Sequence, residues 1–139
     1  MAQRFGSTTI ATTENTDISD ISEEAAGFVS GAGIADGLFT AHVAGSTASV
    51  TTIEYEGGVV GDLAAALERL VPSDAHYDHD ARWGDGNGYS HVRAAIMKPS
   101  LTIPVKDGEL MLGTWQQLVL ADFDNKPRRR KVIFHVIGD

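Results

Sequence analysis

"LTIPVKDGELMLGTWQQLVLADFDNKPRRRKVIFHVIG", residues 101–138, decides the fold class, because nearly all of it has the pattern of β-strands. Turn residues interrupt it at 106–108 (KDG) and 124–127 (DNKP), which predicts an antiparallel meander. The last segment alternates so that Val132, Phe134 and Val136 share one face, and the opposite face is also largely apolar. We therefore expect this strand to be covered on both faces.

The residues before this meander predict both strands and helices. Strand patterns cover 4–14, 37–45 and 47–56, and helical patterns cover 20–33, 57–72 and 90–98. Asp20 and Glu23 are spaced as a capping box for the first helix, and Ser90 is the expected cap of the last. Strands and helices do not alternate regularly. The order predicts an α+β fold, a compact β-sandwich of mostly antiparallel strands with two or three short helices.

Length and composition narrow the class of protein. The chain has 139 residues, enough for one core, so we expect residues 1–139 to form one domain. A net charge of −8 argues against nucleic acid as a partner, because phosphates would be repelled. No apolar run is long enough to span a bilayer, and there is no signal-peptide pattern, so a cytoplasmic protein without a membrane partner is expected. With no cysteine, disulfides and thiolate chemistry are excluded.

The polar segment 76–91, "HYDHDARWGDGNGYSH", holds three of the five histidines. A neutral imidazole can ligate a metal or transfer a proton, so His91 and His79 are candidates for either role. A histidine at a helix start is, on its own, more often structural. We expect His76 to be polar surface only.

Three stretches carry a resemblance to a known family. They are "GSTASVTTIEYE" (45–56), "YDHDARWGDGNGYSHVRAAIMKPSLTIPVKDGELMLGTWQQ" (77–117) and "FDNKPRRRKV" (123–132). The chain resembles the YjbQ-like family, whose members are also called secondary thiamine-phosphate synthases. The resemblance implies a homotrimer, and a polar site near the subunit interfaces. It also implies a modest transferase activity that joins a pyrimidine diphosphate to a thiazole phosphate.

The resemblance also implies roles for individual residues. His79 matches the family's Y-x-H element, and His91 matches the histidine at the start of a helix. Gly45 stands where much of the family has a third histidine, so a three-histidine site is not expected. Glu54 matches the family's glutamate and is the expected third metal ligand, with Asp85 as a weaker choice. Such a set could hold a divalent metal such as zinc, iron, magnesium or manganese.

Other residues are candidates for binding a phosphorylated substrate. Arg128 and Arg130 match the family's spaced arginines, and their alternative role is ion pairing with Asp122, Asp124 or another subunit. Further candidates for substrate binding or catalysis are Ser46, Thr47, Asn87 and Gln116. Small residues with exposed backbone N–H groups suit a phosphate, although an ordinary strand start is equally consistent with that sequence.

Two functions remain open on these grounds. The first is a transferase in which the arginines hold phosphate oxygens, a metal offsets charge, and His91 or Glu54 handles protons. The second is a non-catalytic trimer that binds a small anionic metabolite or a metal.

Overall fold

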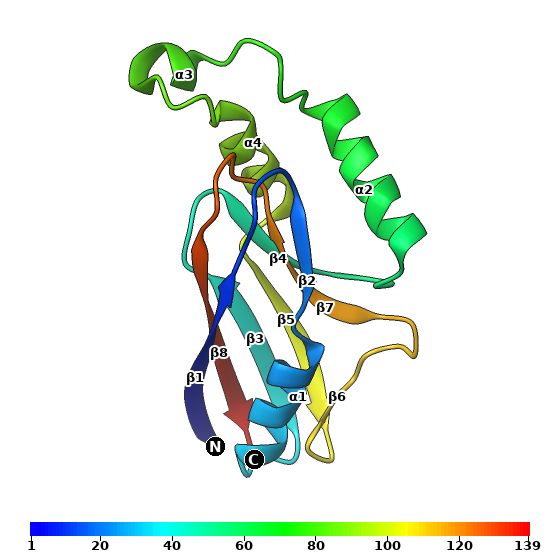
Figure 1. The fold of residues 1–139 in the computed structure, drawn as a ribbon. Helices are drawn as coiled ribbons and strands as arrows, with labels where there is room; N and C mark the ends of the chain where they lie inside the picture. The colour runs from blue at the N-terminus through cyan, green and yellow to red at the C-terminus, as the bar shows by residue number, and fades with distance from the viewer.

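Two antiparallel sheets and four helices make up the protein, in a computed structural model that describes residues 1–139 (Figure 1). The strands are β1 (Ala2–Ala11), β2 (Asp17–Asp20), β3 (Gly37–Val43), β4 (Ala48–Ile53), β5 (Ser100–Lys106), β6 (Glu109–Leu110), β7 (Gln117–Asp122) and β8 (Arg129–Gly138). The helices are α1 (Ser22–Gly31), α2 (Gly57–Leu70), α3 (Asp78–Trp83) and α4 (Gly88–Met97). The larger sheet has the order β1-β8-β3-β5-β6 and the smaller one β2-β7-β4, which confirms the predicted α+β class.

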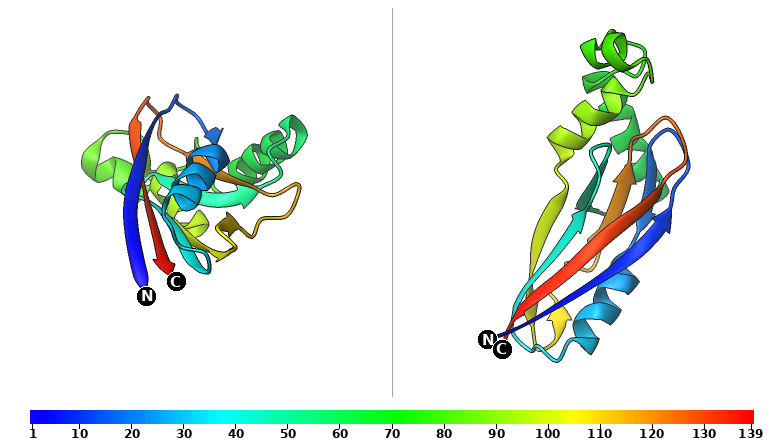
Figure 2. Two further views of the ribbon diagram at one scale, coloured as in Figure 1. Left: turned by 90° about the horizontal axis from the view of Figure 1, so that it is seen from below. Right: turned by 90° about the vertical axis from the view of Figure 1, so that its left-hand side faces the viewer.

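The helices gather at two ends of the molecule. α2, α3 and α4 lie at one end, whereas α1 and both termini lie at the other (Figure 2). The termini are neighbours because β1 pairs with β8 along their whole length, from Ala2 opposite Gly138 to Ala11 opposite Arg129. None of the four helices has both the length and the apolar character that a bilayer span requires.

The main core lies where the inner face of the large sheet meets the small sheet and α1. Its 17 buried residues are Ile21, Ala25, Val29, Ala32, Ile34, Phe39, Ala41, Val43, Ala48, Val50, Ile103, Val105, Leu118, Leu120, Val132, Phe134 and Val136. Burial of each large apolar side chain contributes about 1.5–3 kcal/mol. The apolar residues by which the strands were predicted are therefore also the ones that form the core.

β8 is covered on one face only, which corrects the prediction. Val132, Phe134 and Val136 are buried as expected, but the opposite face of the strand, which includes His135, is only half-buried. No element of the chain lies over that face, since the small sheet and α1 lie on the inner side.

The helix caps and one helix differ from the predictions. α1 begins after Ile21, which has no side chain that could cap it, and Asp20, one residue earlier, accepts a hydrogen bond only from the amide of Ser22. α4 begins two residues earlier than expected, and Ser90 lies inside it with its hydroxyl donating to the Phe123 carbonyl at 2.5 Å. The short helix α3 was not predicted, nor was β2. Both are too short to show a clear periodic pattern.

Candidate functional site

His79 and His91 come together because two helices meet at a tight turn. His79 lies in α3 and His91 in α4, and their ring centroids are 4.5 Å apart. Gly84 and Gly86 lie between the helices with φ near +70°, a left-handed conformation that glycine adopts at little cost. The turn reverses the chain, so two of the predicted site histidines become neighbours.

Two aspartates lie beside His79. Its Nδ1 is 3.3 Å from Oδ1 of Asp80 and 3.4 Å from Oδ1 of Asp85. Asp80 is held in place by the amide of Gly88, which donates to Asp80 Oδ1 at 2.8 Å. Sequence reasoning ranked Asp85 below Glu54 as a metal ligand and did not name Asp80 as one. The structure brings both aspartates to the histidine.

The donor atoms of His79, Asp80 and Asp85 suit a divalent cation. One ligand atom from each residue lies within 4.8 Å of the other two, so small side-chain movements would bring all three around one ion. A set of one imidazole and two carboxylates matches the preferences of zinc, iron or manganese. The three side chains are partly exposed, which leaves room for a substrate or water on the same ion.

His91 also lines a second feature, a cavity of about 250 Å³. The cavity is lined by Gly45, Ser46, Ala48, His91, Ala94, Ala95 and Pro99. Gly45 and Ser46 belong to the exposed turn between β3 and β4, and the amide of Ser46 has no partner among the backbone hydrogen bonds. The predicted free N–H group next to Gly45 is therefore present.

Arg130 lies directly behind this turn. Its side chain is 9% exposed and forms a two-bond ion pair with Asp122, Nε to Oδ2 at 2.6 Å and Nη2 to Oδ1 at 3.0 Å. Nη2 also donates to the Thr47 hydroxyl. Nη1 has no hydrogen-bond partner, and a Cβ placed on Gly45 would be only 2.8 Å from it. One end of a buried guanidinium therefore points at the glycine turn. We call the region formed by His79, His91, Asp80, Asp85, Gly45, Ser46 and Arg130 the histidine–arginine cleft.

Asp122 and Asp124 are the buried anions behind the cleft, and sequence reasoning named them only as alternative partners of the arginines. Both are fully buried, and Asp124 is paired with Arg128 Nε at 2.8 Å. Burial alone would raise the pKa of Asp124. Hydrogen bonds outweigh it, from Asn87 first and then from Arg128, so the pKa of Asp124 lies below its ordinary value.

The other predicted phosphate ligands are mostly used inside this network. Thr47 and Asn87 are buried and donate to Asp124 at 3.1 Å and 3.2 Å, so they support the cleft from behind. The Oδ1 atom of Asn87 is buried without any partner. Arg128 is 39% exposed but engaged with Asp124. Ser46 and Arg130 remain as the residues that can contact an anion directly.

Glu54 and Gln116, which the sequence grouped with the histidines, do not join them within one subunit. Ala48 lines the cleft at the start of β4, whereas Glu54 follows the other end of that strand. At about 3.3 Å per strand residue the two positions lie roughly 20 Å apart. Glu54 lies with the exposed Trp115 in a separate cavity, and Gln116 donates to the Thr52 hydroxyl at 3.1 Å.

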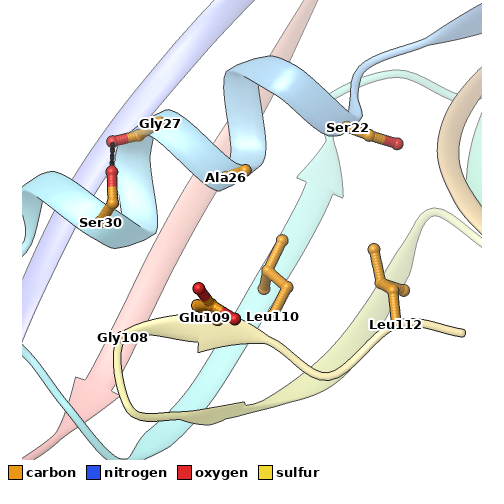
Figure 3. A pocket seen from close by; sticks show the side chains of 8 residues that line it. All are labelled: Ser22, Ala26, Gly27, Ser30, Gly108, Glu109, Leu110 and Leu112. Atoms are coloured by element: carbon orange, nitrogen blue, oxygen red, sulfur yellow. Dashed lines mark hydrogen bonds between the residues drawn. The ribbon is translucent and has the colours of Figure 1, made fainter. Parts of the chain in front are cut away.

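The largest cavity, about 440 Å³, lies elsewhere, between α1 and the β5–β6 hairpin (Figure 3). Leu110 and Leu112 point toward the small residues of α1, and Glu109 is the one titratable side chain that lines the cavity (Figure 3). With a single carboxylate and no cation or histidine, this groove offers little chemistry compared with the histidine–arginine cleft.

The comparisons with known proteins agree with the fold. The profile of the family described as "UPF0047 protein YjbQ-like" matches residues 6–139. A UPF0047 protein of Methanothermobacter thermautotrophicus is 34% identical over 129 residues, 93% of this chain and 88% of that protein. A UPF0047 protein of Mycobacterium tuberculosis is 42% identical over 97 residues, 70% of this chain and 72% of that protein.

Solved structures are similar over nearly the whole chain. One from Sulfolobus solfataricus, described as a protein of unknown function, has a TM-score of 0.95 at 25% identity and covers 99% of both chains. One from Aeropyrum pernix has a TM-score of 0.91 at 29% identity, over 98% of this chain and 99% of that one. These descriptions name no activity, so the activity has to be argued from the cleft.

Proposed function

Because the chain belongs to the YjbQ-like UPF0047 family, we propose that it is a small transferase that joins a pyrimidine diphosphate to a thiazole phosphate in the histidine–arginine cleft. The observation that carries the proposal is the position of His91. It contacts His79 on one side and lines the cavity of Gly45 and Ser46 on the other, with the free Nη1 of Arg130 behind that cavity.

The phosphate side of the cleft is supplied by Arg130 and Ser46. The amide and hydroxyl of Ser46 are hydrogen-bond donors in the lining of a small cavity, and Nη1 of Arg130 lies next to Gly45 of the same lining. Charge-assisted bonds from a guanidinium to phosphate are among the stronger polar contacts in proteins. The ion pair with Asp122 holds the guanidinium still, so little side-chain entropy is lost when an anion binds.

His79, Asp80 and Asp85 would hold a divalent metal, which when bound offsets negative charge on a departing diphosphate. In the reaction, the thiazole nitrogen forms a bond to the methylene carbon of the pyrimidine. The bond from that carbon to the diphosphate oxygen breaks, and its electron pair leaves with the diphosphate. After the new bond has formed, the thiazole nitrogen carries a positive charge, so no proton has to be removed from either substrate. His91 can protonate the leaving diphosphate.

We further propose that copies of the chain form a homotrimer. Supporting this, large apolar side chains are exposed on the single subunit, including Phe5 at 69%, Ile96 at 56% and Trp115 at 73%. In such an assembly, Glu54 and Gln116 of another copy could approach the cleft that they do not reach within one subunit.

A second function is a non-catalytic protein that binds a small anionic metabolite. It is favoured by the charge balance of Arg130, which faces the buried carboxylates of Asp122 and Asp124. It is also favoured by Gly45, which removes the histidine that much of the family is expected to have there. Under this alternative the cleft binds the anion and no turnover follows.

The test combines metal content with turnover. Protein without a tag would be loaded with zinc, manganese or magnesium, and thiamine phosphate and diphosphate would be measured after addition of both substrates. Asp85→Asn and His91→Ala are expected to lower turnover at least tenfold, and Asp85→Asn to lower the bound metal. Glu109→Gln is the matched control, because its carboxylate lines the separate cavity between α1 and the β5–β6 hairpin. Glu54→Gln tests whether a carboxylate of another copy holds the metal instead.

Two results separate the functions, and a third tests the assignment of the metal ligands. Product formation lost in Asp85→Asn supports the transferase. Thermal stabilisation by diphosphate without product supports the binding protein. Loss of metal in Glu54→Gln together with full retention in Asp85→Asn would show that the metal ligands were assigned to the wrong carboxylate.

A further inference from the structure

A second polar pocket lies on the opposite side of α4 from His91. Tyr89 and Arg93 are four residues apart and share one face of the helix, whereas His91 faces the other way. The pocket has a volume of about 280 Å³ and lies between α4, α2 and the turn that joins β1 to β2. Its lining residues are Asn15, Thr16, Ala64, Glu68, Ser73, Tyr89 and Arg93.

Arg93 is the charged wall of this pocket. Its side chain is 3% exposed, and it donates from Nε and Nη2 to the Val71 carbonyl and from Nη2 to Glu68 Oε2 at 2.7 Å. Nη1 donates once, to the Thr16 hydroxyl at 3.2 Å. A guanidinium has five N–H groups, so one N–H of Nη1 is left without a partner in the chain. A buried cation with an unused donor is therefore part of a cavity wall.

The turn opposite Arg93 has an unusual backbone. Asn15 and Thr16 have φ of +65° and +61°. A left-handed conformation is uncommon for residues other than glycine, and for a β-branched threonine it is a clear outlier. Such strain costs free energy and persists where the surroundings fix it, often at ligand-binding positions. Here the strained turn holds the Thr16 hydroxyl against Arg93.

The free hydrogen-bond donors point to the ligand. Because the Thr16 oxygen accepts from Arg93, its hydroxyl proton is available, and no acceptor for it is present in the chain. The Tyr89 hydroxyl has no partner either, although its ring packs under the Arg93 guanidinium at 4.9 Å. The pocket therefore offers three unused donors from Arg93, Thr16 and Tyr89.

Glu68 supplies a hydrogen-bond acceptor opposite these donors. Hydrogen bonds from the Ser73 amide and then from Arg93 lower its pKa, so the carboxylate is ionised near neutral pH. Its Oε2 atom accepts only the bond from Arg93, which leaves one lone pair free. A dianion such as phosphate would be repelled by this carboxylate, whereas a singly charged ligand with a donor group would satisfy both sides.

We propose that this pocket binds a small monocarboxylate that carries a hydroxyl or amino group on the carbon next to the carboxylate. The carboxylate oxygens accept from Arg93 Nη1, the Thr16 hydroxyl and the Tyr89 hydroxyl. The hydroxyl or amino group donates to Glu68. The site is separate from the histidine–arginine cleft and does not depend on the transferase activity.

The experiment is a titration of the ¹⁵N-labelled full chain, followed by amide chemical shifts. The probes are glycolate and glycine, with acetate as the ligand that lacks the donor and inorganic phosphate as the dianion. We expect glycolate or glycine to saturate shifts at Asn15, Thr16 and Ser73, and acetate to bind more weakly. Whichever of glycolate and glycine binds more tightly identifies the donor as hydroxyl or amine.

Two variants test the assignment without risking the fold. Tyr89→Phe removes only a hydroxyl, and Thr16→Gly removes a hydroxyl while placing glycine at a φ that it prefers. Each is expected to weaken binding about tenfold, equivalent to one hydrogen bond to a charged group. Thr16→Gly is also expected to raise the melting temperature, because the backbone strain is relieved.

Binding in the proposed pocket should not depend on His91. His91→Ala lies on the other face of α4 and should bind the probes as the wild type does. Shifts centred on Ser46 and His91, equal binding in Tyr89→Phe and Thr16→Gly, or no saturation by either glycolate or glycine would each overturn the proposal.

Discussion

The guanidinium of Arg130 lies so close to Gly45 that a Cβ on residue 45 would be 2.8 Å from Nη1. Nη1 belongs to a side chain that Asp122 holds by two hydrogen bonds, so it cannot move away freely. Glycine at this position and arginine at 130 are thus a matched pair. A histidine in place of Gly45 would compete with Arg130 for the same space.

Gly45→Ala is therefore expected to destabilise the protein by about 1 kcal/mol, the lower end of the range for an added methyl group, because Gly45 lies on an exposed turn and only the end of Arg130 has to shift. Phosphate binding at Ser46 should weaken as well. Urea unfolding and a phosphate titration would measure the two effects. Gly61→Ala is the control, since nothing lies within 4 Å of its Cβ and alanine favours the α2 helix. Equal stability of Gly45→Ala and the wild type would refute the close contact.

Asp122→Ala is expected to cost about 3–5 kcal/mol, because it leaves the buried Arg130 without its main counter-charge. Asp122 also accepts from the Thr12 hydroxyl at 2.7 Å, which ties β1 into the same network. The comparison is Lys106→Ala, which breaks an exposed ion pair with Asp36 and should change stability little, because water screens the two charges. Chemical denaturation of both variants would measure the two losses of stability. A loss as small as that of Lys106→Ala would mean that water compensates Arg130.

The lowered pKa of Asp124 predicts that the protein loses stability in acid. Its pKa in the folded protein lies below the unfolded value of about 3.9. A depressed pKa contributes stability that is complete above the unfolded value and is lost as the pH falls through the folded value. Asp124→Asn should therefore be less stable than the wild type by a constant amount between pH 5 and 7. Below about pH 4 that difference should shrink. A difference that stays constant down to pH 3 would contradict the shift.

Much of the fold follows from local sequence patterns. Residue types typical of strands located β3, β4 and β5, and the alternation of apolar residues located β8. The repeat of apolar residues also located α2, although its cap is the Glu56 side chain and was not foreseen. α3 and β2 escaped prediction because elements of six and four residues are too short to show a period.

The candidate site was found only in part. His79 and His91 could be named from the sequence because they match a family pattern, and both are in the cleft. Of the carboxylates, Asp85 was ranked second and lies beside His79, whereas Glu54 was chosen by that pattern and follows the far end of β4 within one subunit. The pocket of Arg93 gave no signal, since an arginine within a helical pattern is ordinarily on the surface.

The sequence by itself determined the fold class, because that depends on residue types and their spacing along the chain, and it named the two histidines through their match to a family pattern. Only the tertiary structure decided which groups meet. The β7–β8 turn places Asp122 and Asp124 beside Arg130 and Arg128, and leaves one end of Arg130 facing Gly45. Likewise, Thr16 keeps a left-handed backbone that its own preference opposes, because contacts from other elements hold it there. Contacts between residues distant in sequence depend on how whole elements pack, and no local pattern encodes them.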